Sequence, residues 1–530
     1  MRSARDVTEE LRNLLFATTI AVVAGCSAPA RPGTAPITLV IAQGGDPGAL
    51  NPAVTTSGNT HPITDQMFNG LVGLDAQFNP IPELAERWQI EDGGRTYHFT
   101  LREGVTWHDG RPFTSADVKF TFENALLKYH SRTRAALEGL LIAVETPDER
   151  TAVFRLKRPY SPLLQRLDVV EASIIPRHQY AGQDLLSGEA TRRPIGTGPF
   201  RFVSYAPGTS VVLERNADYF REDLPGVDRL VFRIFPNPSL SVAALENGEV
   251  DYLGSVPGAD AERLRRTPGI AVVAGSGGSG GSICQDVVIP NTTRQPFNDI
   301  RVRRAFAHAL DRAFIVERIY FGQGTPATGP ISHLLSWAYT PETRQYPHDV
   351  EAARRLLSEA GWQPGKSGER FAVTFTHAGN QQRLGQAMRE QLGRVGITLN
   401  LQTLDFNATV ERVFVKKDFD LGFASFCNGA DPDIGVRRVY VSSNIGPFPF
   451  SNGAGYRNAR VDELFDLGSG AVERDKRRSF YVEMQQIVAD EVPYFWLIDS
   501  EGFRAHRTAF TGFRLWTGAF AEAVTLAAAR

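Results

Sequence analysis

Segments typical of strands and segments typical of helices alternate along most of this chain. The stretch FAVTFTH at 371–377 has the pattern of a strand, QRLGQAMREQLGRVG at 382–396 that of a helix, and ITLNLQTLD at 397–405 that of a strand. Such alternation is typical of α/β proteins, in which helices cover a sheet. With 530 residues, the chain is also too long for one hydrophobic core. We therefore predict an α/β fold with at least two lobes.

Composition and charge exclude several classes of protein. With 42% apolar and 22% charged residues, the chain has the composition of a soluble globular protein. Its 57 basic and 59 acidic residues nearly balance, whereas nucleic-acid-binding proteins usually carry a basic excess. Its three cysteines form no CxxC pair, and its ten histidines show no HxH or HExxH spacing. We expect no nucleic-acid partner, no bound metal and no cofactor.

The first 26 residues have the pattern of a bacterial lipoprotein signal peptide. Residues 14–26, LLFATTIAVVAGC, form an apolar run as long as a signal-peptide core and too short to span a bilayer comfortably. The run ends in VAGC, where small residues precede the thiol of Cys26. An ordinary signal peptide and a buried N-terminal helix are the alternatives. Acidic residues dilute the positive charge of the leader, which a true start codon downstream of Met1 would explain. We predict lipidation at Cys26, a flexible spacer over 27–36 and a periplasmic or cell-envelope location.

A glycine- and serine-rich run, GSGGSGGS at 275–282, lies between the strand-like segments IAVVA and ICQDVVI. One interpretation is a slack tether between two domains. The other is a short crossing between two lobes, where glycine allows backbone angles that other residues avoid. We favour the crossing because both flanking segments are strand-like.

An ordered set of motifs gives the chain a family resemblance from Ile37 onward. The longest, LAERWQIEDGGRTYHFTLREGVTWHDGRPFTSADVKFTFEN at 84–124, resembles the signature block of family-5 extracellular solute-binding proteins, the peptide and nickel receptors of bacterial ABC importers. Further matches are GTGPF (196–200), LERNADYF (213–220), NGEVDYL (247–253), PFNDIRVRRAFAHALDR (296–312), GTPATGPI (324–331), ARRLLSEAGW (353–362) and DPD (431–433). The order of these motifs, more than any one of them, carries the resemblance.

The resemblance implies a two-lobed periplasmic-binding-protein (flytrap) fold with an extra subdomain inserted in the first lobe. The implied bounds are 37–58, 180–276 and 505–530 for lobe I, 59–179 for the inserted subdomain and 284–500 for lobe II. The chain would cross between the lobes near 275–283 and return near 500–505. The glycine run would then be a hinge-side crossing.

The stretch LGFASFCNGADPDIGVRRVY at 421–440 resembles the main ligand-facing strand and loop of the family. Peptide receptors place an aspartate about three residues before the DPD-like turn, where it pairs with the ligand's ammonium. That position is Asn428 here, or Gly429 if the alignment shifts by one residue. A neutral amide cannot neutralise a buried ammonium. Either the ligand has no free amine, as in a blocked peptide, an opine-like conjugate or an oligosaccharide, or another acid such as Asp431 replaces the missing one.

The resemblance implies ligand-binding roles for Ser57, Phe426, Cys427, Asn428, Asp431 and Tyr440. Ser57 would reach the ligand from lobe I, Phe426 and Cys427 would supply apolar contact, and Tyr440 would supply a hydroxyl group. A disulfide between Cys284 and Cys427 would restrict lobe closure, and we expect these two cysteines to remain unpaired.

The block at 84–124 also contains Trp107, His108 and Asp109, which at first sight suggest acid–base chemistry. Adjacent residues in a strand or turn point in different directions, and no motif places a nucleophile beside them. We expect this block to be scaffold.

The resemblance implies capture and delivery rather than catalysis. The lobes would close on a small molecule, a peptide-like or a neutral or anionic conjugate, and present it to an ABC permease and ATPase complex. We expect a monomer with no catalytic residues. An extracytoplasmic hydrolase is the rival from another class, but no motif supplies its nucleophile and base. A receptor that presents its ligand to a signalling sensor is a third class, and the sequence features do not distinguish it from a transport receptor.

Overall fold

The computed structural model describes residues 36–274, 283–447 and 449–528. The chain divides into a unit of residues 1–35 and a unit of residues 36–530, and every described residue lies in the second unit. The predicted signal peptide, Cys26, the spacer up to residue 35 and the glycine run at 275–282 therefore lie outside the described residues. Within the described part, no helix combines the length and the hydrophobicity that a bilayer crossing requires.

A seven-stranded sheet in the order β12-β19-β11-β1-β10-β9-β8 forms the centre of the first lobe. Its strands are β1 (Thr38–Gln43), β8 (Phe200–Ala206), β9 (Ser210–Arg215), β10 (Arg229–Ile234), β11 (Tyr252–Val256), β12 (Ile270–Ala274) and β19 (Phe503–Arg507). β1 pairs in parallel with β10 on one side and β11 on the other. The helices α7 (Pro238–Glu246) and α8 (Gly258–Arg265) make the connections from β10 to β11 and from β11 to β12.

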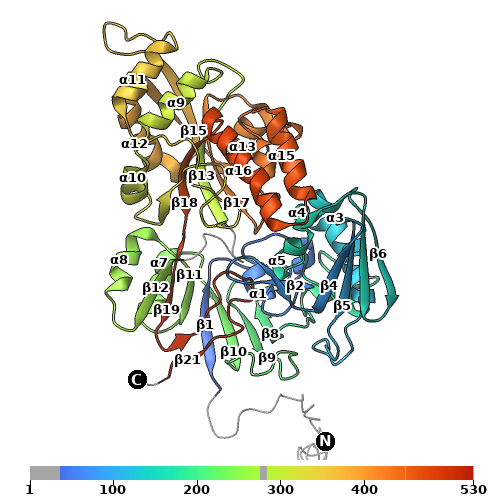
Figure 1. Cartoon of the computed structure of the whole chain (residues 1–530). Coiled ribbons are helices and arrows are strands. Elements are labelled where there is room, and N and C mark those ends of the chain that lie inside the picture. The colour runs from blue at the N-terminus through green and yellow to red at the C-terminus, as the bar shows by residue number, and fades with distance from the viewer. Residues whose placement is uncertain (1–35, 275–282, 448, 529–530) are drawn as a thin grey trace, which may run out of the picture. The chain divides into compact units, whose positions relative to one another are not determined.

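A second, four-stranded antiparallel sheet in the order β4-β5-β7-β6 lies within the first half of the chain. Its strands are β4 (Ala85–Glu91), β5 (Thr96–Leu101), β6 (Leu141–Asp148) and β7 (Thr151–Leu156), and α2 (Ser115–Phe120), α3 (Leu127–Tyr129) and α4 (Ser131–Leu137) lie between β5 and β6. Figure 1 shows this sheet beside the lower lobe. Tyr97, Phe99 and Phe154 fill its core with aromatic contacts.

The His108–Asp109 pair does not form a catalytic dyad in this subdomain. His108 Nδ1 accepts a hydrogen bond from the Gly196 amide at 3.1 Å, and its Nε2 lies 3.0 Å from the Gly198 carbonyl oxygen. Asp109 instead pairs with His178 at 2.9 Å. The two motifs WHDG and GTGPF thus meet through a half-buried histidine, and the contact is structural.

The six-stranded sheet of the second lobe has the order β14-β18-β13-β17-β15-β16. Its strands are β13 (Ile283–Pro290), β14 (Gly324–Pro326), β15 (Phe371–Ala378), β16 (Ile397–Leu404), β17 (Leu421–Asn428) and β18 (Phe495–Ser500). The longer helices of this lobe are α9 (Ile300–Ala309), α11 (Val350–Glu359), α12 (Gln382–Gly393), α15 (Ala459–Gly470) and α16 (Arg474–Glu491). Every residue of β13 is buried, because this central strand is covered on both faces.

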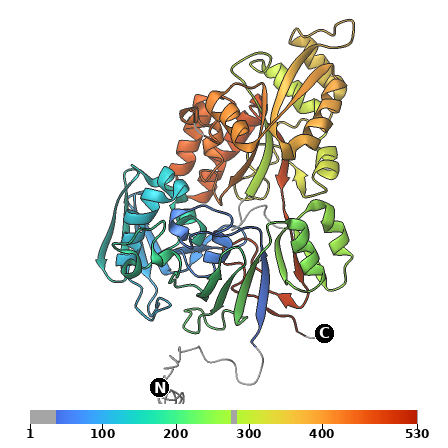
Figure 2. The same ribbon diagram turned by 180° about the vertical axis from the view of Figure 1, so that it is seen from behind.

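One described connection joins the two large sheets. β18 of the six-stranded sheet ends at Ser500, and β19 of the seven-stranded sheet begins at Phe503. Figure 1 and Figure 2 both show the red strand β18 leading directly into β19 beside the green strands. β19 begins two residues before the predicted bound of 505, and the lobe bounds stay a prediction. The fold class is the predicted two-lobed α/β fold.

Cys284 and Cys427 form a disulfide, so the expectation that they remain unpaired is wrong. They occupy directly opposed positions of the antiparallel pair β13–β17, with their Cα atoms 3.9 Å apart. Cross-strand neighbours are close enough for such a bridge. Both strands belong to the second lobe, so the bridge reinforces that lobe and does not tie it to the other one.

Candidate ligand-binding site

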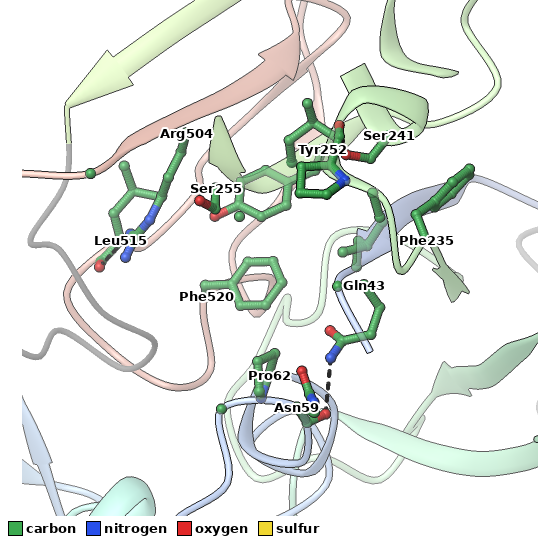
Figure 3. Close-up of a pocket in the computed structure, with 18 of the residues that line it drawn as sticks. Gln43, Asn59, Pro62, Phe235, Ser241, Tyr252, Ser255, Arg504, Leu515 and Phe520 are labelled. Atoms are coloured by element: carbon green, nitrogen blue, oxygen red, sulfur yellow. Dashed lines mark hydrogen bonds between the residues drawn. The ribbon is translucent and has the colours of Figure 1, made fainter. Parts of the chain in front are cut away.

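A cavity of about 460 Å³ opens in the first lobe at the carboxyl ends of β1 and β11 (Figure 3). Ligands of open α/β sheets commonly bind at this end of the strands. Its apolar lining includes Pro62, Phe235, Tyr252, Leu515 and Phe520, and its polar lining includes Gln43, Asn59, Ser241, Ser255 and Arg504. The size and the mixed lining suit a small organic solute.

Aromatic rings form one side of this cavity. The Tyr252 ring lies nearly parallel to the rings of Phe513 and Phe520, with centroids 4.9 and 5.0 Å away. Figure 3 shows Phe520 and Tyr252 together at the cavity. Tyr252 stands at the first position of β11 and Phe520 comes from the C-terminal segment, so the tertiary fold joins them. The stack provides a flat apolar surface against which a ligand can pack.

A turn before α1 (His61–Thr64) forms the opposite side of the cavity. Gln43 at the end of β1 donates a hydrogen bond to the Asn59 carbonyl at 3.0 Å, which holds the turn against the sheet (Figure 3). The Ser57 hydroxyl accepts a hydrogen bond from the Asn59 amide at 3.2 Å. Ser57 therefore shapes the turn, and its neighbours Gly58 and Asn59 line the cavity.

A buried acid lies beneath this turn. Asp65 lines the cavity, and its Oδ1 is 2.9 Å from His61 Nδ1. Its Oδ2 is buried and has no hydrogen-bond partner. Burial raises the pKa of Asp65, although His61 and Arg132 act in the opposite direction. The first lobe thus has one carboxylate at the cavity, and that carboxylate is already paired on one side.

The predicted site residues on β17 face opposite sides of their sheet. Ser425 and Cys427 are exposed, whereas Phe426 and Asn428 are buried, because successive side chains of a strand alternate. The Phe426 ring packs edge-on against Phe414 and Tyr494 in the lobe core. β17 therefore presents the disulfide at Cys427, and not Phe426, at its exposed face.

Asp431 and Tyr440 also lie inside the second lobe. Asp431 is fully buried, and its Oδ2 is 2.7 Å from Arg477 Nη2. The Tyr440 hydroxyl accepts a hydrogen bond from Trp496 Nε1 at 2.8 Å. Because Arg477 already neutralises Asp431, this acid is poorly placed to replace the carboxylate that Asn428 lacks.

Asn428 ends β17 at the start of the loop. It is 8% exposed, and its buried Oδ1 has no hydrogen-bond partner. Gly435 packs against it so closely that an added Cβ would lie 2.3 Å from Oδ1, and Gly435 has a φ of 115°. This glycine therefore allows the loop to fold back on Asn428.

Sequence reasoning missed the first-lobe cavity and the arginine that contacts the backbone of β17. Tyr252 falls in the motif NGEVDYL, but the motif alone does not show which way the ring points. Arg438 Nη2 donates a hydrogen bond to the Cys427 carbonyl at 3.3 Å, a contact that depends on the loop conformation. Among the described residues, no cluster of three or more His, Cys, Asp or Glu side chains suits a metal ion.

Comparison with known proteins identifies the family. Residues 79–447 match the family of bacterial extracellular solute-binding proteins, family 5 Middle. Di/tripeptide-binding protein 2 of Pseudomonas aeruginosa is 29% identical over 509 residues, covering 91% of this chain and 93% of that protein. Heme-binding protein A of Haemophilus influenzae is 28% identical over 482 residues, covering 86% of each chain. The solved structure of HbpA2 from Haemophilus parasuis has a TM-score of 0.82 at 25% identity, covering 92% of this chain and 100% of that one. The chain belongs to the family-5 extracellular solute-binding proteins.

Proposed function

We propose that this protein captures a peptide-like solute between its two lobes and delivers it, chemically unchanged, to an ABC permease and ATPase complex. The observation that carries the proposal is the cavity at the carboxyl ends of β1 and β11, with its aromatic stack and polar rim. The names of the relatives above describe binding of di- and tripeptides or of heme. A solute with both apolar and polar groups fits such a lining.

Recognition would depend on contacts with both lobes. A ligand seated on Tyr252 and Phe520 would meet the exposed face of β17 at Cys427, and the loop that begins at Asn428, when the lobes close. Only a ligand that binds the closed state better than the open state can shift the equilibrium between them. The closed state would then be the one that the permease recognises.

Asn428 bears on the charge of the ligand. Its amide offers no negative charge to a free amino terminus, and Asp431 is already paired with Arg477. A blocked or amine-poor peptide is therefore our first choice of ligand. An opine-like conjugate or an oligosaccharide is the second, because either would also lack an ammonium group at this position.

We further propose that the protein is a monomer held outside the cytoplasm by lipid on Cys26. Mass spectrometry of the membrane-bound protein should find a diacylglycerol on this cysteine, and Cys26→Ala should release the protein from the membrane. A Cys26→Ala protein that stays membrane-bound would contradict the lipid anchor.

Native mass spectrometry of the purified protein would test the ligand class. We expect a bound peptide-like molecule of unchanged mass, and Phe520→Ala should weaken its binding about tenfold by removing one aromatic contact. Phe520→Leu is the matched control, because it keeps most of the apolar area. A bound sugar would favour the second ligand class, and conversion of the ligand on incubation would support the rival hydrolase.

A further inference from the structure

The inserted subdomain touches the second lobe at the junction between α15 and α16. The Ser161 hydroxyl donates a hydrogen bond to the Ala471 carbonyl. Gly94 approaches the same junction so closely that an added Cβ would lie 3.1 Å from Val472 Cγ2. Figure 1 and Figure 2 both show α15 and α16 ending beside the inserted subdomain, away from the connection between β18 and β19. The two lobes are therefore in contact at a second place.

A short hairpin reaches this junction from the inserted subdomain. Its strands β2 (Val72–Leu74) and β3 (Pro80–Pro82) pair in antiparallel, and residues 75–79 form the hairpin tip. Asp75 Oδ1 accepts hydrogen bonds from the Gln77 and Asn79 amides, both at 2.8 Å, and its Oδ2 accepts one from the Asn79 side chain at 2.8 Å. These bonds lie within the tip, so its shape does not depend on the second lobe.

Phe78 occupies a strained position in this hairpin tip. Its φ is 59°, in the left-handed region that bulky side chains rarely adopt. The side chain is only 8% exposed, whereas Ala76 and Gln77 beside it are exposed. It belongs to the hydrophobic cluster of the second lobe, whose other buried members lie between Ile283 and Ile498. Burial in the other lobe thus offsets the strain of the backbone.

Arg474, the first residue of α16, binds the same tip from the second lobe. Its guanidinium donates to the side-chain oxygen of Asn79 and, from Nη2 at 3.4 Å, to the Gln77 carbonyl. It also lies 5.0 Å from the centre of the Trp337 ring, and Trp337 Nε1 donates to the Ala430 carbonyl at 3.1 Å. The second lobe therefore binds the tip through a buried ring and through an arginine that packs on its own tryptophan.

The position of this contact relates it to lobe movement. Rotation of the lobes about the connection between β18 and β19 would separate the hairpin tip from α16. A contact that exists in one arrangement of the lobes and is lost in the other shifts the equilibrium towards the first. Phe78 does not line the first-lobe cavity, so its effect on a bound solute would come through the arrangement of the lobes.

We propose that Phe78 and Arg474 form a latch between the hairpin tip and α16 that stabilises the closed arrangement of the lobes. The proposal rests on the proposed function, because capture between two lobes requires them to open and close. It makes Phe78 a positioning residue, which strengthens binding of the solute without contacting it.

Small-angle X-ray scattering of the purified protein without added solute would test the latch. Phe78→Gly removes the ring, and glycine suits the left-handed backbone, so the tip should keep its shape. Burial of a phenylalanine side chain is worth about tenfold to a hundredfold in an equilibrium constant. The variant should therefore shift towards the open arrangement and show a larger radius of gyration. Gln77→Ala, at an exposed position of the same tip, is the matched control. Identical scattering from the unaltered protein and a folded Phe78→Gly protein would overturn the latch.

Arg474→Gln should act in the same direction with a smaller shift, because hydrogen bonds near the surface contribute less than a buried ring. Its control is Arg478→Gln on the same helix, since Arg478 Nη2 donates to the Tyr339 carbonyl within the second lobe at 3.2 Å. Residues of one latch should be coupled, so the shifts of Phe78→Gly and Arg474→Gln should not add in the double variant. Strictly additive shifts would overturn a shared latch.

Thermal unfolding would distinguish the latch from a contact that only stabilises the second lobe. A Phe78→Gly protein with a lower Tm and an unchanged radius of gyration would show such a contact, and would overturn the latch. A larger radius of gyration in a variant that unfolds at the same temperature would support it.

Calorimetry with N-acetyl-trialanine, a peptide without a free amine, would connect the latch to solute binding. We expect Phe78→Gly to weaken this peptide about tenfold, although residue 78 lies outside the cavity lining. Equal affinities of the unaltered protein and the variant would overturn the role of the latch in capture. If the unaltered protein does not bind the peptide, the peptide-like ligand of the proposed function is contradicted, and the scattering comparison alone decides the latch.

Discussion

The first-lobe cavity and the end of β17 in the second lobe differ in the groups that they offer to a ligand. In the first lobe, Gln43 is held by the Asn59 carbonyl, Tyr252 packs against two phenylalanine rings, and the unpartnered oxygen, Asp65 Oδ2, belongs to a carboxyl group that His61 already binds. In the second lobe, Asn428 Oδ1 and Arg438 Nε are buried without partners. Aromatic surface selects a ligand by shape and apolar area, whereas unpaired polar groups select it by hydrogen bonding and charge. Under the proposed function, the two lobes would therefore divide recognition between them.

The largest expected effect comes from breaking the buried ion pair between Asp431 and Arg477 in the second lobe. Arg477→Ala would leave the fully buried Asp431 without its partner at 2.7 Å. Removing one partner of a buried ion pair costs about 3–5 kcal/mol in the free energy of unfolding, measurable by urea denaturation. Arg460→Ala, which breaks an exposed pair, should cost less than about 1 kcal/mol. Similar losses for both variants would show that the loop after β17 does not depend on this pair.

Removing the disulfide should come next in size. Cys284→Ser with Cys427→Ser, or reduction of the unaltered protein, should lower stability by about 2–4 kcal/mol, because the bridge restrains the unfolded chain. Thermal unfolding with and without a reducing agent would measure this. Two free thiols titrating at these positions in the denatured, unreduced protein would contradict the bridge.

Lowering the pH should change the stability of the two lobes differently. Burial lowers the pKa of His108 to about 4. An unfolded histidine titrates near 6.5, so the unfolded state binds more protons, and stability falls as the pH drops from about 6.5 towards 4. The loss at pH 5 should be about 2 kcal/mol. In the second lobe a hydrogen bond to Asp499 raises the pKa of His333, so its contribution persists in acid and is lost as the pH rises through that pKa.

Hydrogen exchange followed by mass spectrometry at pH 7 and pH 5 would separate the lobes. Protection should fall first in the subdomain that contains His108. His108→Gln should remove part of the difference between the two pH values. Equal acid sensitivity of the unaltered protein and this variant would contradict the assignment.

The smallest expected effect comes from changing the charge at position 428 in the second lobe. Asn428→Asp would place a carboxylate at the end of β17, so trialanine amide, which carries a free amino terminus, should bind about tenfold more tightly, and N-acetyl-trialanine, which carries only a carboxylate, more weakly. The two affinities measured by calorimetry, with Asn400→Asp on β16 as an exposed control, would check this. No change in either affinity would mean that Asn428 does not face the ligand.

Part of this arrangement could be predicted from the sequence, and one error was avoidable. The order of the motifs indicated the family and the two lobes, and the comparison confirms the family. Phe426 and Cys427, however, were both expected to face the ligand, although adjacent side chains of a strand point to opposite faces. The alternation of burial along β17 shows which of them is exposed.

Other features depend on pairs of residues that no local pattern connects. Cys284 and Cys427 are 143 residues apart, and only the antiparallel register of β13 and β17 sets them opposite each other. Asp431 belongs to a motif that suggested a role at the ligand, but it pairs inside the lobe with Arg477 on α16. Side-chain direction and partner choice depend on how distant segments pack.

The sequence by itself determined the α/β class, the family and the neutral residue at position 428, because periodicity, motif order and residue identity are local properties. Only the tertiary structure decided that Tyr252 stacks on Phe520, that the two cysteines are bridged, and that Arg438 contacts the Cys427 carbonyl. The physical reason is that burial, register and charge pairing arise between segments far apart in the chain.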